Sequence, residues 1–179
     1  MALYHAWAQV HLGWALSQLG TAPGLDEIEA GLREVRQIGA GRLESFYLGL
    51  AAEAYASAGR PDEARTSIAQ AFAALAQNRD LAFAAELHRT RAVLSLRAGA
   101  GERGAAEADL RRALQIARQQ EAPSLQLRAA RDLARVLAER GERSQAADLL
   151  APIYAWFTEG FDTPDLKEAK ALLDELAAA

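Results

Sequence analysis

Apolar residues recur every three or four positions along most of the chain, and short breaks that contain glycine or proline separate the periodic segments. Such spacing places the apolar side chains on one face of an α-helix. No stretch alternates apolar and polar residues for long enough to indicate a β-strand. Alanine and leucine are the commonest residues, and they lose little freedom on entering a helix. We therefore predict an all-α chain.

Three of the breaks share a pattern in which a glycine precedes an alanine by five residues. The pattern starts at Gly59, Gly101 and Gly141, so the period is 42 and then 40 residues. Gly20 lies a further 39 residues upstream of Gly59, although the match after it is looser. Repetition at this spacing indicates a helical repeat array, in which each unit buries its apolar face against its neighbours.

The breaks predict a single domain over residues 1–179, made of four helical pairs and one further helix. The predicted units are residues 1–40, 42–80, 82–121 and 124–159, and the predicted last helix covers 163–177. Breaks at Gly39–Gly41 and Asn78–Asp80 close the first two units. The turn Gly99–Gly101 is two residues longer than its counterparts, which predicts a shifted register in the third unit.

The same spacing predicts which side chains pack between helices. In the first helix we expect this face to be Leu12, Leu16 and Leu19. The later packed faces are expected at Ile28, Leu32 and Val35; at Leu48, Ala51, Ala52 and Tyr55; at Ala64, Ile68, Ala71, Phe72 and Leu75; at Leu87, Leu94 and Ala98; and at Ala130, Leu133, Ala134, Leu137, Ala146 and Leu150.

The C-terminal part of the pattern has features of its own. Pro152 falls inside a predicted helix, so we expect a kink or break near Ala151. Thr163 is expected to cap the last helix, which would cover the exposed core of the fourth pair. We expect Trp156 to pack in the core or between repeats, and Phe161 to pack in the joint before the last helix. The stripe of that helix is Leu166, Ala169, Leu172, Leu173 and Leu176.

Composition narrows the classes of protein. The chain contains no cysteine, which excludes disulfides and thiolate metal sites. It has no apolar run of membrane-spanning length and no signal-peptide pattern at its start, so we predict a cytoplasmic protein with no membrane contact. The net charge of −4 argues against a nucleic-acid partner. Charge is uneven, since residues 141–179 hold three basic and eight acidic side chains.

Small residues where paired helices touch, a turn glycine and an alanine five residues later resemble the tetratricopeptide repeat (TPR). The matching positions of the second unit are Leu48, Ala51, Ala52, Tyr55, Gly59, Ala64 and Ala71, and those of the fourth are Ala134, Leu137, Gly141 and Ala146. The resemblance implies a right-handed α-α superhelix, a TPR-like solenoid of about four hairpins with a C-terminal capping helix.

Two longer stretches, Gly13–Gly20 and Ala151–Lys170, resemble the C-terminal repeat region of large bacterial signalling proteins. In that family a class III adenylate/guanylate cyclase domain precedes an ATPase and a TPR region. The resemblance implies that this chain corresponds to the non-catalytic part. The sequence has no phosphate-binding glycine-rich loop of the P-loop type and no cyclase-type paired aspartates. We therefore predict neither enzyme activity nor a cofactor.

The three histidines, His5, His11 and His88, do not share a helix face, so we predict no metal site. The TPR register instead places other side chains in a concave groove. These groove candidates are Trp7 and Trp14 in the first unit, Glu53 and Ser57 in the second, and Arg128, Arg131 and Arg135 in the fourth, with Arg89 nearby. The arginines would grip an acidic peptide or chain terminus. The alternative is a solvated face paired with Glu and Asp of neighbouring helices.

Two functions remain open from the sequence. The first is a protein-interaction module that binds a peptide or partner domain in its groove. For this module we predict that exchanging Arg128, Arg131 and Arg135 for Glu abolishes binding without lowering the melting temperature. The second is a regulatory segment that senses a small ligand or self-associates as a homodimer through its N-terminal edge, and so controls an attached cyclase or ATPase.

Overall fold

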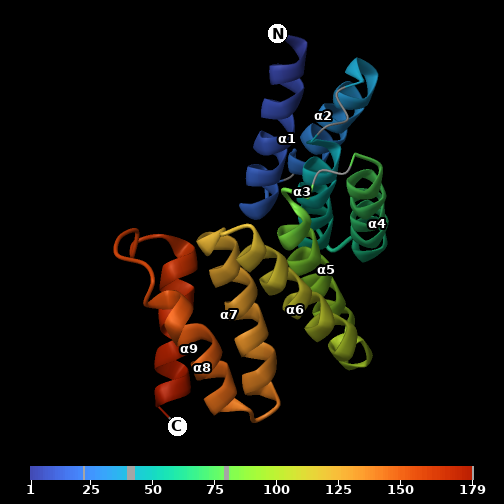
Figure 1. Cartoon of the computed structure of the whole chain (residues 1–179). Coiled ribbons are helices and arrows are strands. Elements are labelled where there is room, and N and C mark those ends of the chain that lie inside the picture. Colours follow the sequence, from blue (N-terminus) through green and yellow to red (C-terminus); the bar gives the residue numbers. More distant parts are fainter. Residues whose placement is uncertain (22, 40–42, 79–80, 179) are drawn as a thin grey trace. The chain divides into compact units, whose positions relative to one another are not determined.

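The computed structural model describes residues 1–21, 23–39, 43–78 and 81–178. Within these ranges all regular structure is helical, which confirms the all-α prediction (Figure 1). The helices are α1 (Ala2–Gln18), α2 (Gly24–Ile38), α3 (Glu44–Ser57), α4 (Pro61–Asn78), α5 (Ala84–Ala98), α6 (Arg103–Gln119), α7 (Pro123–Glu139), α8 (Arg143–Tyr154) and α9 (Pro164–Ala177). The predicted breaks at Ala40–Gly41 and Arg79–Asp80 lie outside the described residues.

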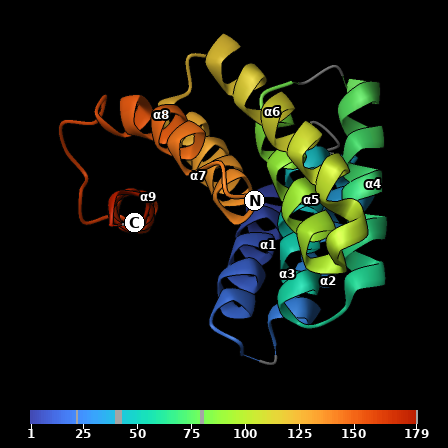
Figure 2. The same ribbon diagram turned by 90° about the horizontal axis from the view of Figure 1, so that it is seen from below.

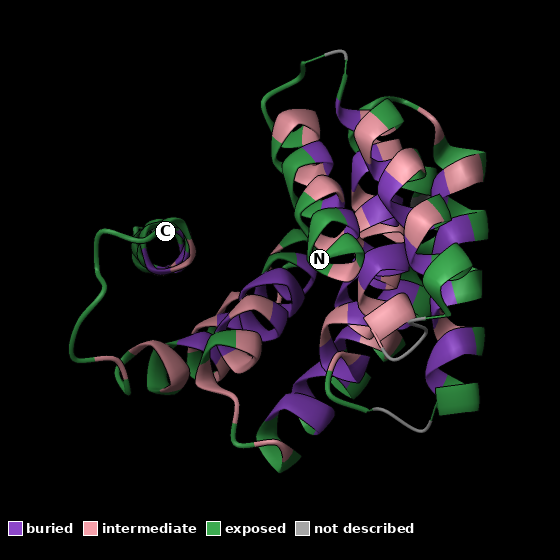
Figure 3. Ribbon diagram, turned by 90° about the horizontal axis from the view of Figure 1, so that it is seen from above, coloured by how far each residue is buried: buried purple, intermediate pink, exposed green. Residues whose placement is uncertain are grey.

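Contacts divide the chain into two compact units, which are described separately below. The N-terminal unit is Met1–Leu94 and the C-terminal unit is Ser95–Ala179, so the boundary falls inside α5. In the N-terminal unit α3 packs against α1, α2 and α4. Seven residues of α3 are buried as a result, against three of α1. Figure 3 colours the chain by the burial of each residue.

The face of α1 that packs on α2 is not the predicted leucine stripe. Its buried residues are Ala6, Val10 and Gly13, whereas Leu12 and Leu19 are exposed. Small residues occupy this face because the two helix backbones approach very closely. A Cβ atom added to Gly13 would lie 2.6 Å from two backbone atoms of α2. These are the carbonyl oxygen of Gly24 and the nitrogen of Ile28. Periodicity alone favours large apolar residues and therefore selected the wrong face.

The other predicted faces are largely confirmed. Tyr55, Phe72 and Leu94 are half-buried, and Ala98 is exposed. The buried members are Ile28, Leu32, Val35, Leu48, Ala51, Ala52, Ala64, Ile68, Ala71, Leu75, Leu87, Ala130, Leu133, Ala134, Leu137, Ala146 and Leu150.

The turn glycines locate the repeat more accurately than the sequence pattern did. Gly20, Gly59 and Gly141 have φ angles of +69°, +74° and +86°, in the left-handed region that glycine adopts without steric cost. In the third unit this role falls to Gly99, with φ +127°, and not to Gly101. The residues after Gly99 form a short 3₁₀ helix before α6 begins. The two extra residues of this turn therefore follow the turn glycine.

This assignment predicts opposite outcomes for two neighbouring glycines. Gly99→Ala should lower the free energy of unfolding by about 1–3 kcal/mol, because an L-residue is strained at that φ. Gly101→Ala should change it by less than about 0.5 kcal/mol, because its φ is not positive and an added Cβ meets nothing within 4 Å. Urea unfolding followed by circular dichroism measures both. A larger loss at Gly101 would restore the sequence-based register.

In the C-terminal unit α9 packs against both α7 and α8, as expected for a capping helix. Its residues Leu166, Ala169, Leu172 and Leu176 are buried, and Leu173 is half-buried. Figure 2 shows the long loop that leads from α8 into this helix.

Three predictions about the region before α9 need correction. The helix α8 continues through Pro152 and ends at Tyr154, so the predicted break does not occur near Ala151, and the alternative of a kink there stays a prediction. Pro152 removes one backbone hydrogen bond, and only two residues of α8 follow it. Trp156 is 65% exposed and does not pack in the core. Thr163 occupies the cap position of α9, but its hydroxyl donates to the Gly160 carbonyl oxygen at 2.7 Å and caps nothing.

Candidate functional site

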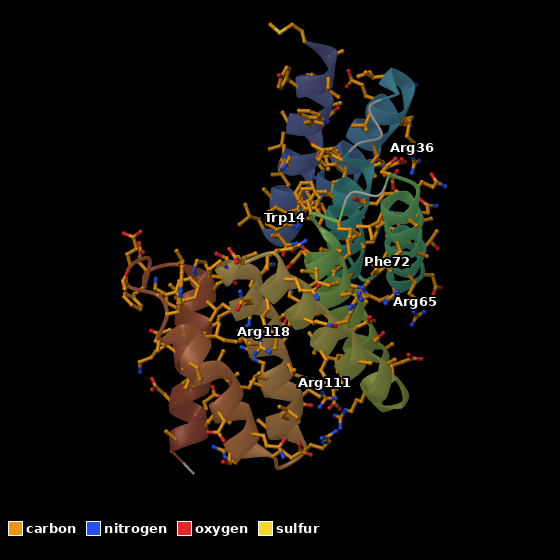
Figure 4. All side chains as sticks on the ribbon, viewed as in Figure 1. Trp14, Arg36, Arg65, Phe72, Arg111 and Arg118 are labelled. Atoms are coloured by element: carbon orange, nitrogen blue, oxygen red, sulfur yellow. The ribbon has the colours of Figure 1, made fainter. Side chains whose placement is uncertain are left out.

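Three helices of the N-terminal unit each contribute to one polar cluster, the Glu53 cluster, which comprises Trp14, Glu53, Glu86, Arg89 and Thr90. The indole nitrogen of Trp14, labelled on α1 in Figure 4, donates to Glu53 Oε2 at 2.9 Å. From α5, Arg89 Nη2 and Thr90 Oγ1 each donate to Glu53 Oε1 at 3.1 Å. The carboxylate of Glu53 on α3 therefore connects α1 to α5.

Arg89 also binds Glu86 within α5, with Nη2 and Nε at 2.6 and 2.8 Å from Glu86 Oε1. The Arg89 side chain is only 9% exposed and that of Glu53 is 21% exposed. A guanidinium this buried requires carboxylate partners, because an unpaired buried charge is costly. Among its described members, the cluster contains two carboxylates and one guanidinium. The cluster therefore offers hydrogen-bond acceptors more readily than positive charge.

The other two candidates of the N-terminal unit do not join this cluster. Trp7 is half-buried, with its ring edge-on to Tyr4 at 5.5 Å between centroids and 6.3 Å from the ring of Tyr47. Its indole nitrogen is enclosed and finds no acceptor among the described residues. Ser57 is exposed at the end of α3. Trp7 thus belongs to the aromatic packing between α1 and α3.

In the C-terminal unit, Arg131 is at the centre of an ion-pair network that attaches α9 to α7. Its Nη1 atom donates to Glu168 Oε2 at 2.7 Å and to Asp165 Oδ1 at 3.3 Å. Its Nε and Nη2 atoms donate to Asp132 Oδ1 at 3.0 and 2.9 Å. With 9% of its side chain exposed, Arg131 is a structural residue of this unit.

The remaining arginines of the predicted patch differ from Arg131. Arg128 has its Nε 3.9 Å from Asp165 Oδ1 and a side chain 29% exposed, and Arg135 is exposed. Arg89 belongs to the Glu53 cluster of the other unit. Arg89 and Arg131 are both buried, and each pairs with acidic residues of a neighbouring helix.

A pocket that the sequence did not indicate lies among α2, α3 and α4 in the N-terminal unit. Its volume is about 340 Å³. Tyr55 donates its hydroxyl to Glu29 Oε1 at 2.9 Å, and Arg60 Nη1 lies 3.7 Å from the same oxygen. Burial and the nearby Glu29 carboxylate raise the pKa of Tyr55 to about 12. The lining residues are Glu29, Leu32, Arg33, Arg36, Leu48, Tyr55, Glu63, Thr66, Ser67 and Gln70.

The histidines are engaged at three separate places. His5 Nδ1 lies 3.0 Å from Glu34 Oε2, His11 Nδ1 lies 2.8 Å from a backbone carbonyl oxygen, and His88 packs edge-on against Phe72. Across the described ranges, no group of three His, Asp or Glu side chains is arranged to hold a metal ion. In the same part of the chain, no helix has both the length and the apolar character needed to cross a membrane.

Comparison with known proteins gives one sequence relative and a shared fold. No protein-family model matches the chain. An uncharacterized protein of Rhizobium meliloti (strain 1021) is 36% identical over 128 residues, which is 71% of this chain and 12% of that protein. The chain thus spans about an eighth of the length of this relative.

Two solved structures cover nearly the whole chain. Both are crystal structures of nearly identical TPR-like repeats of a Podosopora anserina protein described as a kinesin light chain. The first has a TM-score of 0.69 at 18% identity and covers 99% of this chain and 95% of its own. The second has a TM-score of 0.63 at 18% identity, with 98% and 86% covered. This chain therefore has the TPR-like repeat fold.

Proposed function

We propose that this chain is a cytoplasmic protein-interaction module that binds a peptide or partner domain on the face formed by α1, α3 and α5. The observation that carries the proposal is the Glu53 cluster, which connects these three helices and in which Trp14 and Glu53 are half-buried. TPR-like repeats generally act as protein-interaction scaffolds and typically lack catalysis, and the groove of the TPR register lies along such first helices.

The chemistry of the cluster suits recognition of a donor-bearing segment. Glu53 Oε2 accepts from Trp14, and a carboxylate oxygen can accept about two hydrogen bonds. A backbone N–H or a cationic side chain of the partner would complete it. Internal partners already fix the side chains, so binding loses little side-chain freedom. Because Arg89, Arg128 and Arg131 have partners within the chain, an acidic partner would depend on Arg135.

We propose that the module is a regulatory region of a larger bacterial signalling protein. The bacterial relative supports this context, because the match spans only 12% of that protein. The stretches Gly13–Gly20 and Ala151–Lys170, which resemble the repeat region of cyclase–ATPase–TPR proteins, support it independently.

Two observations favour the regulatory alternative. The pocket beside Tyr55 has the size of a small-molecule site, and its polar lining suits a polar ligand. Self-association is favoured by α1, which has no Asp, Glu, Lys or Arg and exposes Tyr4 and Leu12, and by Leu19, which is exposed directly after the helix. A monomer in light scattering at high protein concentration would disfavour the homodimer.

The interaction proposal is tested with short peptides selected from a displayed random library on the immobilised chain. We expect Glu53→Gln and Trp14→Ala each to lower the affinity for the tightest-binding peptide about tenfold in calorimetric titration. This is the effect typical of a residue at the centre of an interface. Glu121→Gln, a charge loss at an exposed site of the other unit, should leave affinity within twofold of the unaltered chain. Equal affinity for all four proteins would contradict the proposal.

A further inference from the structure

The loop between α8 and α9, residues 155–163, exposes two large aromatic side chains. Trp156 is 65% exposed and Phe161 is 48% exposed. Single exposed apolar residues are common, but two large rings in one short connection are typical of a binding surface. This aromatic loop belongs to the C-terminal unit and shares no residue with the Glu53 cluster.

The loop is held in one conformation by contacts of its own. Each exposed ring packs against a half-buried ring. The ring of Trp156 is edge-on to that of Phe157 with 5.3 Å between centroids, and the centroids of Phe161 and Tyr154 are 6.0 Å apart. Gly160 has a φ of +75°, and its carbonyl oxygen accepts from both the backbone nitrogen and the hydroxyl of the cap residue of α9, at 2.9 and 2.7 Å. Exposed rings on an ordered loop are preorganised for a partner.

Along the chain, the charged residues in and next to the loop are all acidic. No lysine or arginine occurs between Arg143 and Lys167, while this interval contains four acidic residues. Glu159 and Asp162 lie in the loop itself and are exposed. Asp165 is instead held by Arg131 of α7. The loop therefore combines aromatic faces with two exposed carboxylates.

We infer that the aromatic loop is a docking site for a cationic, arginine- or lysine-rich segment of a partner protein. An arginine or lysine side chain is attracted to the negative face of an indole ring, and tryptophan is the best of the aromatic residues for this contact. Glu159 and Asp162 would pair with neighbouring cations of the same segment. The two carboxylates would repel an acidic segment. The expected partner therefore differs in charge from the acidic peptide predicted for Arg128, Arg131 and Arg135.

A peptide of alternating arginine and glycine serves as the probe, and a peptide of equal length with glutamate in place of arginine serves as its control. Both are titrated at physiological ionic strength into the full chain labelled with ¹⁵N. The three tryptophans give three indole resonances, which report on Trp7, Trp14 and Trp156 separately. We expect the arginine peptide to shift the Trp156 resonance and to leave that of Trp14 in place.

Variants measure the contribution of each part. Trp156→Ala should weaken binding of the arginine peptide about tenfold, and Glu159→Gln combined with Asp162→Asn about threefold or more. Matched controls are Leu81→Ala, which removes a large exposed apolar side chain of the other unit, and Glu102→Gln with Glu121→Gln, which removes two exposed charges of the same unit. Both controls should bind within twofold of the unaltered chain, and circular dichroism checks that every variant is folded.

The inference is overturned if the chain binds both peptides equally, or if folded Trp156→Ala binds the arginine peptide as the unaltered chain does. A shift of Trp14 without a shift of Trp156 would also overturn it and would assign the cationic peptide to the Glu53 cluster. If the library-selected peptides bind independently of Glu53 while the arginine peptide still requires Trp156, the interaction proposal fails and the inference about the loop is supported.

Discussion

Gly13→Ala is expected to lower the free energy of unfolding by about 2–4 kcal/mol, although alanine is the better helix former by about 1 kcal/mol. The reason is the close approach of α1 and α2. An added methyl group would lie 2.6 Å from backbone atoms of the facing helix, and backbone cannot move aside as a side chain can. The helices would have to separate, which would loosen the contacts of Val10 and Ile28.

Gly104→Ala is the matched control for this prediction. Gly104 also lies inside a helix, but a Cβ atom there meets nothing within 4 Å. Alanine should therefore leave stability unchanged or raise it by up to about 1 kcal/mol. Urea denaturation followed by far-ultraviolet circular dichroism measures both variants. If Gly13→Ala proved as stable as Gly104→Ala, the close α1–α2 packing would be wrong.

Arg131→Ala is the second substitution with a large expected effect, a loss of about 2–4 kcal/mol. Removing one partner of a buried ion pair typically costs about 3–5 kcal/mol, because the remaining charges stay desolvated. We reduce this figure because Asp165 and Glu168 are 42% and 50% exposed, so water stabilises them when the arginine is absent. Asp132 is only 9% exposed and contributes most of the loss.

Arg135→Ala provides the comparison on the same helix, and its exposed side chain should contribute less than about 0.5 kcal/mol. Both melting temperatures are measured by scanning calorimetry. Equal melting temperatures would show that the network around Arg131 does not stabilise the unit. The triple exchange of Arg128, Arg131 and Arg135 for Glu is consequently expected to lower the melting temperature, contrary to the sequence-based prediction.

Helix positions were largely predictable because breaks and apolar spacing are local signals. The bounds of α9 and the packed faces of α2 and α4 follow directly from them. The packed face of α1 could not be predicted from these signals. Close backbone contact at Gly13 requires small residues there, whereas packed helix faces usually carry large apolar residues. The sequence pattern assigned Gly101 as the turn glycine because it uses only the spacing between residues. Spacing does not reveal which glycine has the positive φ angle.

The side chains of the candidate site could be named from the sequence, but their pairing could not. The repeat register named Trp14 and Glu53 as groove candidates and placed Arg89 near Arg128, Arg131 and Arg135, whereas the structure joins Arg89 to Glu53 by a hydrogen bond. The register gave no means to see that Arg131 meets Asp165 and Glu168, because those residues lie 34 and 37 positions away on a helix that is not part of the repeat. The exposure of Trp156 could not be predicted either. This residue follows the end of α8, where the helical spacing of apolar residues no longer indicates which side chains are buried.

The most direct test of the interaction proposal is the ¹H–¹⁵N spectrum of the full chain during titration with a library-selected peptide. The indole N–H of Trp14 donates to Glu53, so any ligand that contacts the carboxylate changes the environment of that proton. We predict that the Trp14 resonance moves progressively and saturates together with binding, and that Glu53→Gln raises the peptide concentration needed for half the shift about tenfold. Saturating peptide that leaves the Trp14 resonance unmoved would contradict the account.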